Sequence, residues 1–190
     1  MKGSQCVSSY LNGRGATVWL TGLPCSGKST LGSMLASWMR ERGYPRELLD
    51  GDEVRLNLSK GLGFSREDRD INVRRIGFVS RLLCRNGVMA IAAMVSPYRS
   101  TRQEIRQSIG NDFIEIFVDC PIHVCSQRDV KGMYKQAHAG LLKGFTGVDD
   151  PYEPPESPEL IIKSSEEQPE VSLRNILEVL AVRGYIRSDL

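Results

Sequence analysis

Five apolar stretches of four to eight residues alternate along the chain with longer amphipathic segments. This alternation is typical of βαβ units, so it predicts an α/β fold with a parallel five-stranded sheet flanked by helices on both faces. Residues 88–95 (VMAIAAMV) are apolar throughout, as expected for a strand that is buried on both sides. The predicted strands are 16–20, 46–49, 88–95, 113–118 and 160–163.

The amphipathic segments predict four helices, at 27–42, 66–86, 101–109 and 171–183. A glycine follows each of them: Gly43, Gly87, Gly110 and Gly184. Glycine adopts the left-handed conformation that ends a helix more easily than any other residue, so these positions support the helix boundaries.

The length of 190 residues suits one compact domain, and we predict an N-terminal arm (1–15) followed by a single domain (16–190). Residues 140–158 interrupt the alternation because they carry three glycines and four prolines. They are expected to form an ordered loop, and a loop this long inside a compact domain is usually functional.

The net charge of +2 gives no reason to expect a nucleic acid or a membrane as partner. The distribution is uneven, since residues 65–106 hold nine arginines and four acids, whereas residues 149–170 hold eight acids and one lysine. Arginine recognises phosphate and sulfate through two parallel hydrogen bonds, so the first region is a candidate anion-binding surface. The alternative is that most of these arginines lie on solvated helix faces.

The five cysteines are odd in number and contain no C-x-x-C pair, which argues against a disulfide framework and a zinc site. No signal-peptide pattern or membrane-spanning apolar run is found in the sequence. These observations predict a cytoplasmic protein.

A phosphate-binding loop follows the first predicted strand and opens the first predicted helix. Residues 22–30 (GLPCSGKST) match G-x-x-x-x-G-K-[ST]. The pattern predicts that Lys28 contacts the β- and γ-phosphates of ATP and that Ser29 binds Mg²⁺. The predicted nucleotide-binding residues of the loop are Gly22, Cys25, Ser26, Gly27, Lys28, Ser29 and Thr30.

Two carboxylates, Asp50 and Asp52, end the second predicted strand. They are expected beside the phosphate-binding loop, at the sheet edge where α/β proteins bind ligands. Asp50 could support Mg²⁺, and Asp52 could orient an attacking hydroxyl or accept its proton. The alternative is a pair of capping aspartates. Asp119, at the end of another strand, is a second candidate for a metal carboxylate.

From residue 17 to about 184 the chain resembles the adenylylsulfate (APS) kinase family. The resemblance rests on the phosphate-binding loop and on a series of motifs in order: LDGD (49–52) with Arg55, GLGFS (61–65), NVRRIG (72–77), SPY (96–98), RDVKG (128–132) and KGFTG (143–147). It implies a P-loop kinase that uses ATP and Mg²⁺ to phosphorylate the 3′-hydroxyl of APS, giving PAPS and ADP in sulfate assimilation.

The resemblance also implies which residues form the APS site. They are Asp52, Arg55, Phe64, Arg69, Asn72, Val95, Ser96, Lys131, Gly144 and Phe145. Arg69 and Asn72 share one helix face, so both could approach the phosphosulfate. Phe64 and Phe145 lie in glycine-rich loops where an aromatic ring has little core to fill, so they could sandwich the adenine. The alternative for both rings is anchoring of their loops.

Three further residues take their roles from the resemblance. Arg128 and Lys131 resemble lid residues that close over the nucleotide phosphates; the alternative is a solvated helix face. Ser96 resembles a serine for which the family is often assigned a phosphoserine intermediate. Direct in-line transfer with Ser96 contacting the substrate is preferred, because no obvious base lies nearby to activate its hydroxyl. The expected catalytic residues are therefore Lys28, Asp52 and Ser96.

Two other functions stay open at this point. One is a P-loop kinase for a sugar acid or a nucleoside monophosphate, and the other is a catalytically silent nucleotide-binding module that regulates a sulfurylase. The aromatic pair argues against the first and intact Lys28, Ser29 and Asp52 argue against the second. The resemblance implies a homodimer and leaves open association or fusion with ATP sulfurylase.

Overall fold

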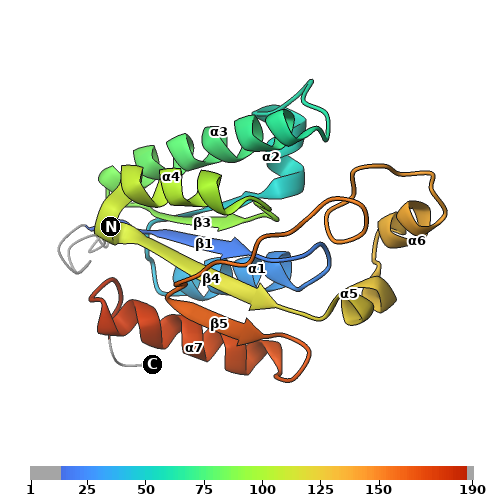
Figure 1. Cartoon of the computed structure of the whole chain (residues 1–190). Coiled ribbons are helices and arrows are strands. Elements are labelled where there is room, and N and C mark those ends of the chain that lie inside the picture. The colour runs from blue at the N-terminus through green and yellow to red at the C-terminus, as the bar shows by residue number, and fades with distance from the viewer. Residues whose placement is uncertain (1–13, 188–190) are drawn as a thin grey trace, which may run out of the picture.

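The computed structural model describes residues 14–187 and has a parallel five-stranded sheet at its centre (Figure 1). The strand order is β2-β3-β1-β4-β5. The strands are β1 (Thr17–Thr21), β2 (Arg46–Asp50), β3 (Met89–Ala93), β4 (Phe113–Asp119) and β5 (Leu160–Lys163). The predicted fold is confirmed, and each strand lies within two residues of its predicted position.

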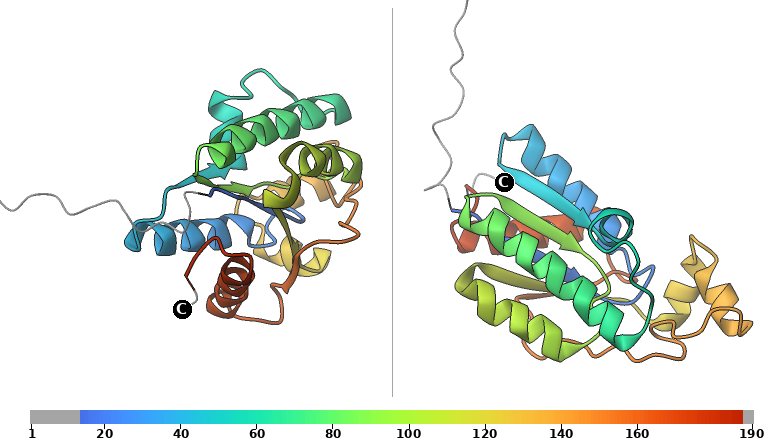
Figure 2. Two further views of the ribbon diagram at one scale, coloured as in Figure 1. Left: turned by 90° about the vertical axis from the view of Figure 1, so that its left-hand side faces the viewer. Right: turned by 90° about the horizontal axis from the view of Figure 1, so that it is seen from above.

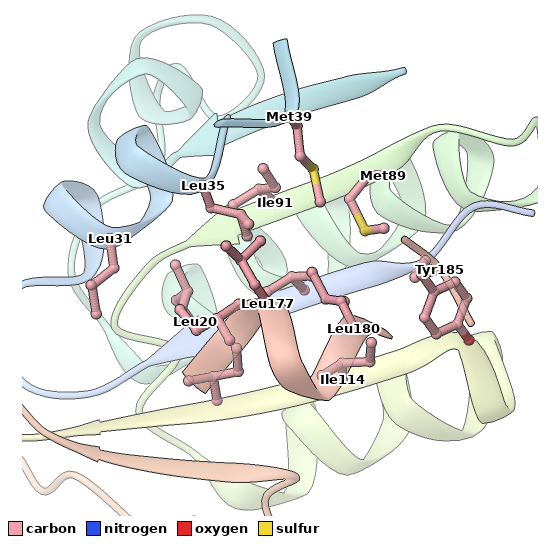
Figure 3. Close-up of a cluster of buried hydrophobic side chains, with 14 of the residues drawn as sticks. Leu20, Leu31, Leu35, Met39, Met89, Ile91, Ile114, Leu177, Leu180 and Tyr185 are labelled. Carbon is pink, nitrogen blue, oxygen red and sulfur yellow. The ribbon is translucent and has the colours of Figure 1, made fainter. Parts of the chain in front are cut away.

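Helices cover both faces of the sheet (Figures 1 and 2). One face packs against α1 (Lys28–Glu41) and α7 (Pro169–Val182), and the other packs against α3 (Arg66–Arg85) and α4 (Arg99–Ile109). Because side chains alternate along a strand, β1 contributes side chains to the hydrophobic cores on both faces of the sheet. Val18 and Leu20 belong to the core under α1 and α7, while Trp19 belongs to the core under α3 and α4. Figure 3 shows Leu20 in the first of these cores.

The four long helices end as the glycines predict. Gly43, Gly87, Gly110 and Gly184 all have φ between 76° and 78°. Three short helices were not predicted: α2 (Gly51–Asn57), α5 (Ile122–Arg128) and α6 (Met133–His138). A helix of six or seven residues shows too little hydrophobic periodicity to be recognised. A 3₁₀ turn (Gly110–Asp112) follows α4.

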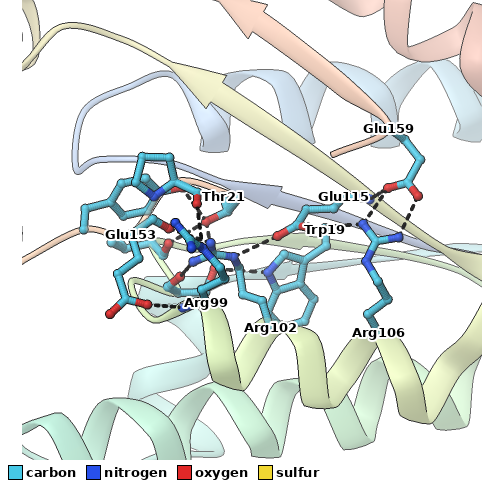
Figure 4. A network of polar contacts seen from close by, with 12 residues as sticks. Trp19, Thr21, Arg99, Arg102, Arg106, Glu115, Glu153 and Glu159 are labelled. Carbon is cyan, nitrogen blue, oxygen red and sulfur yellow. Dashed lines mark hydrogen bonds and ion pairs between the residues drawn. The ribbon is translucent and has the colours of Figure 1, made fainter. Parts of the chain in front are cut away.

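A buried ion pair joins α4 to the central sheet. The guanidinium of Arg102 donates to Glu115 Oε1 at 2.8 Å, and both side chains are less than a tenth exposed. Arg102 also donates to Ser96 O and to Glu153 O, both at 2.6 Å (Figure 4). One side chain therefore connects α4 with β4, with the turn after β3 and with the segment that precedes β5.

The long loop at 140–158 contains no helix or strand. It is ordered by its own acidic side chains, such as Asp149, which accepts from Gly144 N, and Asp150, which pairs with Arg69, and this agrees with the prediction. Of the predicted N-terminal arm, residues 1–13 lie outside the described residues, whereas Arg14 pairs with Asp112 at 2.5 Å. In the part of the chain from 14 to 187, no helix is long and apolar enough to cross a bilayer.

We predict that Arg102→Met lowers the free energy of unfolding by about 3–5 kcal/mol, because it removes one partner of a buried charge pair. Chemical denaturation measures this change. Arg99→Met is the matched control, since Arg99 pairs with Glu156 at a position exposed to solvent. It should change stability by less than about 1 kcal/mol. Equal losses in the two variants would contradict the role given to Arg102.

Candidate functional site

A cavity of about 850 Å³ opens at the carboxyl edge of the sheet. Ligands of open α/β sheets bind at this edge, where the strand order reverses beside the first strand. Most of the predicted site residues line the cavity: Cys25, Gly27, Lys28, Ser29, Thr30, Asp50, Asp52, Arg55, Phe64, Arg69, Asn72, Val95, Ser96, Arg128, Lys131 and Phe145. Gly22, Ser26 and Gly144 belong to the same loops but do not line it.

The phosphate-binding loop connects β1 to α1 and needs glycine at two positions. A Cβ on Gly22, where φ is 151°, would lie 2.4 Å from Val118 O. Gly27, with φ 106°, directly precedes α1. These glycines let the backbone turn tightly and bring the N-terminus of α1, with its free N–H groups, to the cavity.

Lys28 is 7% exposed and lies at the floor of the cavity. Its ammonium donates to Leu23 O at 2.6 Å and to Ser26 Oγ at 3.3 Å. Burial lowers the pKa of Lys28 from 10.5 to about 8. A negatively charged ligand in the loop would favour the charged form of this amine.

Ser29 and Asp50 place two oxygen ligands side by side. Ser29 Oγ donates to Asp50 Oδ2 at 2.7 Å, and Asp50 Oδ1 accepts from the backbone N–H of Asp52 at 3.0 Å. Asp50 therefore also caps α2, as the alternative interpretation held. A hydroxyl and a carboxylate fit Mg²⁺, which prefers few protein ligands and completes its shell with water and phosphate oxygens. Among residues 14–187 there is no group of three or more His, Cys, Asp or Glu side chains that could hold a metal.

Asp52 and Lys131 form an ion pair across the mouth of the cavity. Asp52 lies in the first turn of α2, and Lys131 lies in the turn between α5 and α6. Both side chains are more than half exposed, so the pair can open to admit a ligand at little cost.

The hydroxyl of Ser96 is engaged inside the protein. It accepts from Trp19 Nε1 at 3.0 Å and donates to Thr21 Oγ1 at 3.0 Å. The residue is 3% exposed and has an unusual φ of 40°. Ser96 lines the cavity, while its hydroxyl already has both a donor and an acceptor.

Arg69 and Asn72 both lie on the inner face of α3, but their partners differ. The Arg69 side chain donates to Phe64 O and Asp150 Oδ2 at 2.9 Å each, and also to Thr146 Oγ1 and Gly144 O. Asn72 is 6% exposed, and its Oδ1 has no hydrogen-bond partner among the described residues. A buried polar atom without a partner is costly unless a ligand satisfies it, so Asn72 is well placed to contact one.

The two phenylalanines lie in different environments. Phe64 is 50% exposed, with the Arg55 guanidinium 4.4 Å from its ring centre. Phe145 is 6% exposed and packs edge-to-face on Tyr134 at 4.9 Å. The expectation that Phe145 has little core to fill is therefore wrong, because its ring belongs to a small apolar cluster with Cys120, Cys125, Tyr134 and Ala137.

The segment that carries α5 and α6 is fixed to the phosphate-binding loop. Arg128 donates to Ser164 O at 2.7 Å and to Cys25 O and Ser26 O at 3.4 Å. Tyr134 OH donates to Pro24 O at 3.1 Å. This segment forms the wall of the cavity over the loop. The lid role expected of Arg128 and Lys131 stays a prediction.

Several cavity residues were missed by the sequence reasoning. Ser164, Glu167, Pro169 and Ser172 line the cavity beside the phosphate-binding loop. Ser164 directly follows β5, and the other three lie between there and the first turn of α7. This was a usable signal, since ligands gather at the carboxyl ends of parallel strands. Asp119, the second metal candidate, also ends a strand but does not line the cavity.

The arginine-rich region is not an anion-binding surface as a whole. All nine arginines of residues 65–106 are described, and Arg69 alone lines the cavity. Three of them, Arg69 included, form ion pairs with acids of residues 149–170: Arg69 with Asp150, Arg99 with Glu156, and Arg106 with Glu159. These three ion pairs join the two oppositely charged regions of the sequence.

We predict that binding of a nucleoside triphosphate takes up a proton through Lys28. With a pKa of about 8, the free lysine loses its charge as the pH rises, and a bound polyphosphate restores that charge. Affinity for ATP should therefore fall as the pH rises through about 8. Calorimetry near this pH in buffers of different ionisation enthalpy measures the uptake.

Lys28→Arg is the matched control, because arginine keeps its proton at any pH used. Proton uptake of the same size in this variant would show that Lys28 is not the group that titrates.

The chain matches the family model for adenylylsulphate kinase over residues 14–163. It is 56% identical over 174 residues to the adenylyl-sulfate kinase of Gloeothece citriformis, which covers 92% of this chain and 98% of that protein. It is also 54% identical over 172 residues to a probable bifunctional SAT/APS kinase of Sorangium cellulosum, covering 90% of this chain and 29% of the relative.

Solved structures give the same result. The APS kinase CysC of Mycobacterium tuberculosis, in complex with AMPPNP and APS, superimposes with a TM-score of 0.83 at 36% identity, over 88% of this chain and 98% of that one. A gluconokinase from Sinorhizobium meliloti at 21% identity and a TM-score of 0.58 shares the fold alone. The family model, the identity of the relatives and the cavity geometry agree: the chain belongs to the adenylylsulfate kinase family.

Proposed function

We propose that this chain transfers the γ-phosphoryl group of ATP to the 3′-hydroxyl of adenosine 5′-phosphosulfate (APS), giving PAPS and ADP. The observation that carries the proposal is one continuous cavity with two kinds of wall. The phosphate-binding loop with Lys28 and Ser29 lies on one side, and Arg55, Phe64 and Asn72 lie on the other. Its volume of about 850 Å³ is at the large end for a ligand pocket, as two nucleotides require.

ATP is proposed to bind on the side of the phosphate-binding loop. The N–H groups at the start of α1 and the ammonium of Lys28 face its phosphates and stabilise the charge that grows during transfer. Ser29 and Asp50 would hold Mg²⁺, which in phosphoryl transfer neutralises phosphate charge. Ser164, Glu167, Pro169 and Arg128 form the remaining wall on this side.

APS is proposed to bind against α2, α3 and the loop that carries Phe145. The buried Oδ1 of Asn72 has no partner among residues 14–187 and can accept a hydrogen bond from the substrate. The exposed ring of Phe64 offers a flat apolar surface for the adenine. Phe145 supports the same wall from within its cluster, so we assign it the edge of the adenine site.

Asp52 is proposed to orient the 3′-hydroxyl and to accept its proton as the oxygen attacks the γ-phosphorus. Its carboxylate lies at the cavity mouth and is held by Lys131 alone among the side-chain contacts described. The attacking oxygen forms a P–O bond while the bond to the ADP oxygen breaks. Direct transfer is favoured over a phosphoserine intermediate because the Ser96 hydroxyl is occupied by Trp19 and Thr21.

We also propose that the chain is cytoplasmic and forms a homodimer. It could further associate with, or be fused to, an ATP sulfurylase. The described cysteines Cys25, Cys84, Cys120 and Cys125 are free thiols, as in reducing compartments. A relative from Sorangium cellulosum is named as bifunctional, and an APS kinase from Thiobacillus denitrificans at 39% identity is named as hexameric. Analytical ultracentrifugation of the purified chain tests the dimer.

We predict that Asp52→Asn lowers kcat by about 10²- to 10⁴-fold, the usual contribution of a positioned acid or base, with KM for ATP nearly unchanged. A coupled assay of ADP release measures both constants. APS without its 3′-hydroxyl should bind and release no ADP. If Asp52→Asn instead weakened ATP binding and preserved kcat, Asp52 would belong to the nucleotide or metal site.

A further inference from the structure

Asp150 does not line the main cavity, but it contacts Arg69. Arg69 joins the two loops that carry Phe64 and Phe145, on the proposed APS side of the cavity. Arg69 donates through Nε to Phe64 O and through its terminal nitrogens to Gly144 O and Thr146 Oγ1. A single guanidinium therefore fixes the backbone of both phenylalanine-bearing loops.

The carboxylate of Asp150 forms an ion pair with the guanidinium of Arg69. Asp150 Oδ2 accepts from Arg69 at 2.9 Å, and the two side chains are 23% and 8% exposed. An ion pair this sheltered is screened less by salt than a surface pair, and its loss leaves a buried charge without a partner.

Tyr98 also binds the carboxylate of Asp150. Its hydroxyl donates to Asp150 at 3.1 Å, and the residue is 2% exposed. The guanidinium of Arg66 stacks 4.4 Å from the centre of the Tyr98 ring. Tyr98 directly precedes α4, so Asp150 connects the loop to a rigid element of the core.

The backbone of the loop closes on the same residue. Gly147 N donates to Asp150 O at 2.8 Å, and Asp150 N donates to Phe145 O at 3.3 Å. The neighbouring Asp149 accepts from Gly144 N and Phe145 N at 2.7 and 2.6 Å. These two bonds hold the pKa of the Asp149 carboxyl below its usual value, so it stays ionised and keeps the turn closed.

From this geometry we infer that Asp150 and Tyr98 are positioning residues for the acceptor: they hold Arg69 and thereby set the spacing between the loops of Phe64 and Phe145. Neither residue lines the cavity, so neither touches the substrate. The inference deepens the proposed function and rests on it. Arg69 then has four protein contacts, in addition to the substrate contact that the family resemblance implies.

The test compares Asp150→Asn and Tyr98→Phe with Glu156→Gln in the full chain. Glu156 is the matched control, because it is an acid of the same segment whose arginine partner, Arg99, lies away from the cavity. Loss of a charge-assisted hydrogen bond should raise KM for APS roughly 10-fold in Asp150→Asn, and loss of the neutral one roughly 3-fold in Tyr98→Phe. KM for ATP should stay within about 2-fold in all three variants, since the phosphate-binding loop is not touched.

Because both substitutions act through Arg69, the double variant should raise KM for APS by less than the product of the single effects. Asp150→Glu, which keeps the charge, should recover part of the loss. If Asp150→Asn is poorly folded, Tyr98→Phe gives the same test, as it removes one oxygen and keeps the ring. KM values for APS and ATP that rise together, or an Asp150→Asn variant that behaves like Glu156→Gln, would overturn the inference.

Hydrogen exchange provides a readout that does not depend on turnover. Amides of residues 144–150 should exchange faster in Asp150→Asn than in the wild type, with exchange in the core strands unchanged. A wild-type chain that releases no ADP with APS would reject the proposed function. Unchanged exchange at 144–150 in Asp150→Asn would reject the positioning role, whatever the acceptor is.

Discussion

Arg102 lies beneath the carboxyl edge of the sheet, and the arrangement of the acceptor side depends on its contacts. It is 2% exposed, pairs with Glu115 on β4, and donates to the carbonyls of Ser96 and Glu153. Figure 4 shows this group with Arg106 and Glu159 beside it. A buried guanidinium needs several acceptors to offset its lost hydration, so the turn after β3 and the segment before β5 must both lie against it. Through Glu153, these contacts hold the loop at 140–158 where it passes the carboxyl ends of the strands.

The two sides of the cavity are held by different forces. The nucleotide side is built on main-chain geometry, with glycines at positive φ, the start of α1, and Ser29 next to Asp50. The acceptor side is built on ion pairs, which hold a loop without regular structure against α3 and α4. The loop after β1 is short and joins a strand of the sheet directly to α1, so these two elements position it. The loop at 140–158 contains no helix or strand, so side-chain contacts have to fix it.

The sequence was sufficient for the features that depend on local patterns. Apolar runs located the strands, glycines located the helix ends, and the motif at 22–30 located the phosphate-binding loop. Ordered family motifs pointed to most of the residues that line the cavity. Their roles as ligands remain predictions.

Features that depend on distant pairs were not predictable in the same way. The clusters of opposite charge at 65–106 and 149–170 were visible, but their pairing was not, since an ion pair such as Arg69 with Asp150 leaves no local signal. For the same reason Phe145 was interpreted as a loop residue without a core, although Tyr134 and Cys125 provide one. The helices α5 and α6 were too short to show a period.

The central claim is that the cavity is built for two nucleotides, one of which is APS. The most direct measurement is ADP release with APS, AMP, gluconate and shikimate as competing acceptors at fixed ATP and Mg²⁺. The account predicts a kcat/KM for APS that exceeds each of the others by at least about 100-fold, because buried polar groups such as Asn72 reject acceptors that leave them unpaired. A comparable kcat/KM for AMP or gluconate would contradict it.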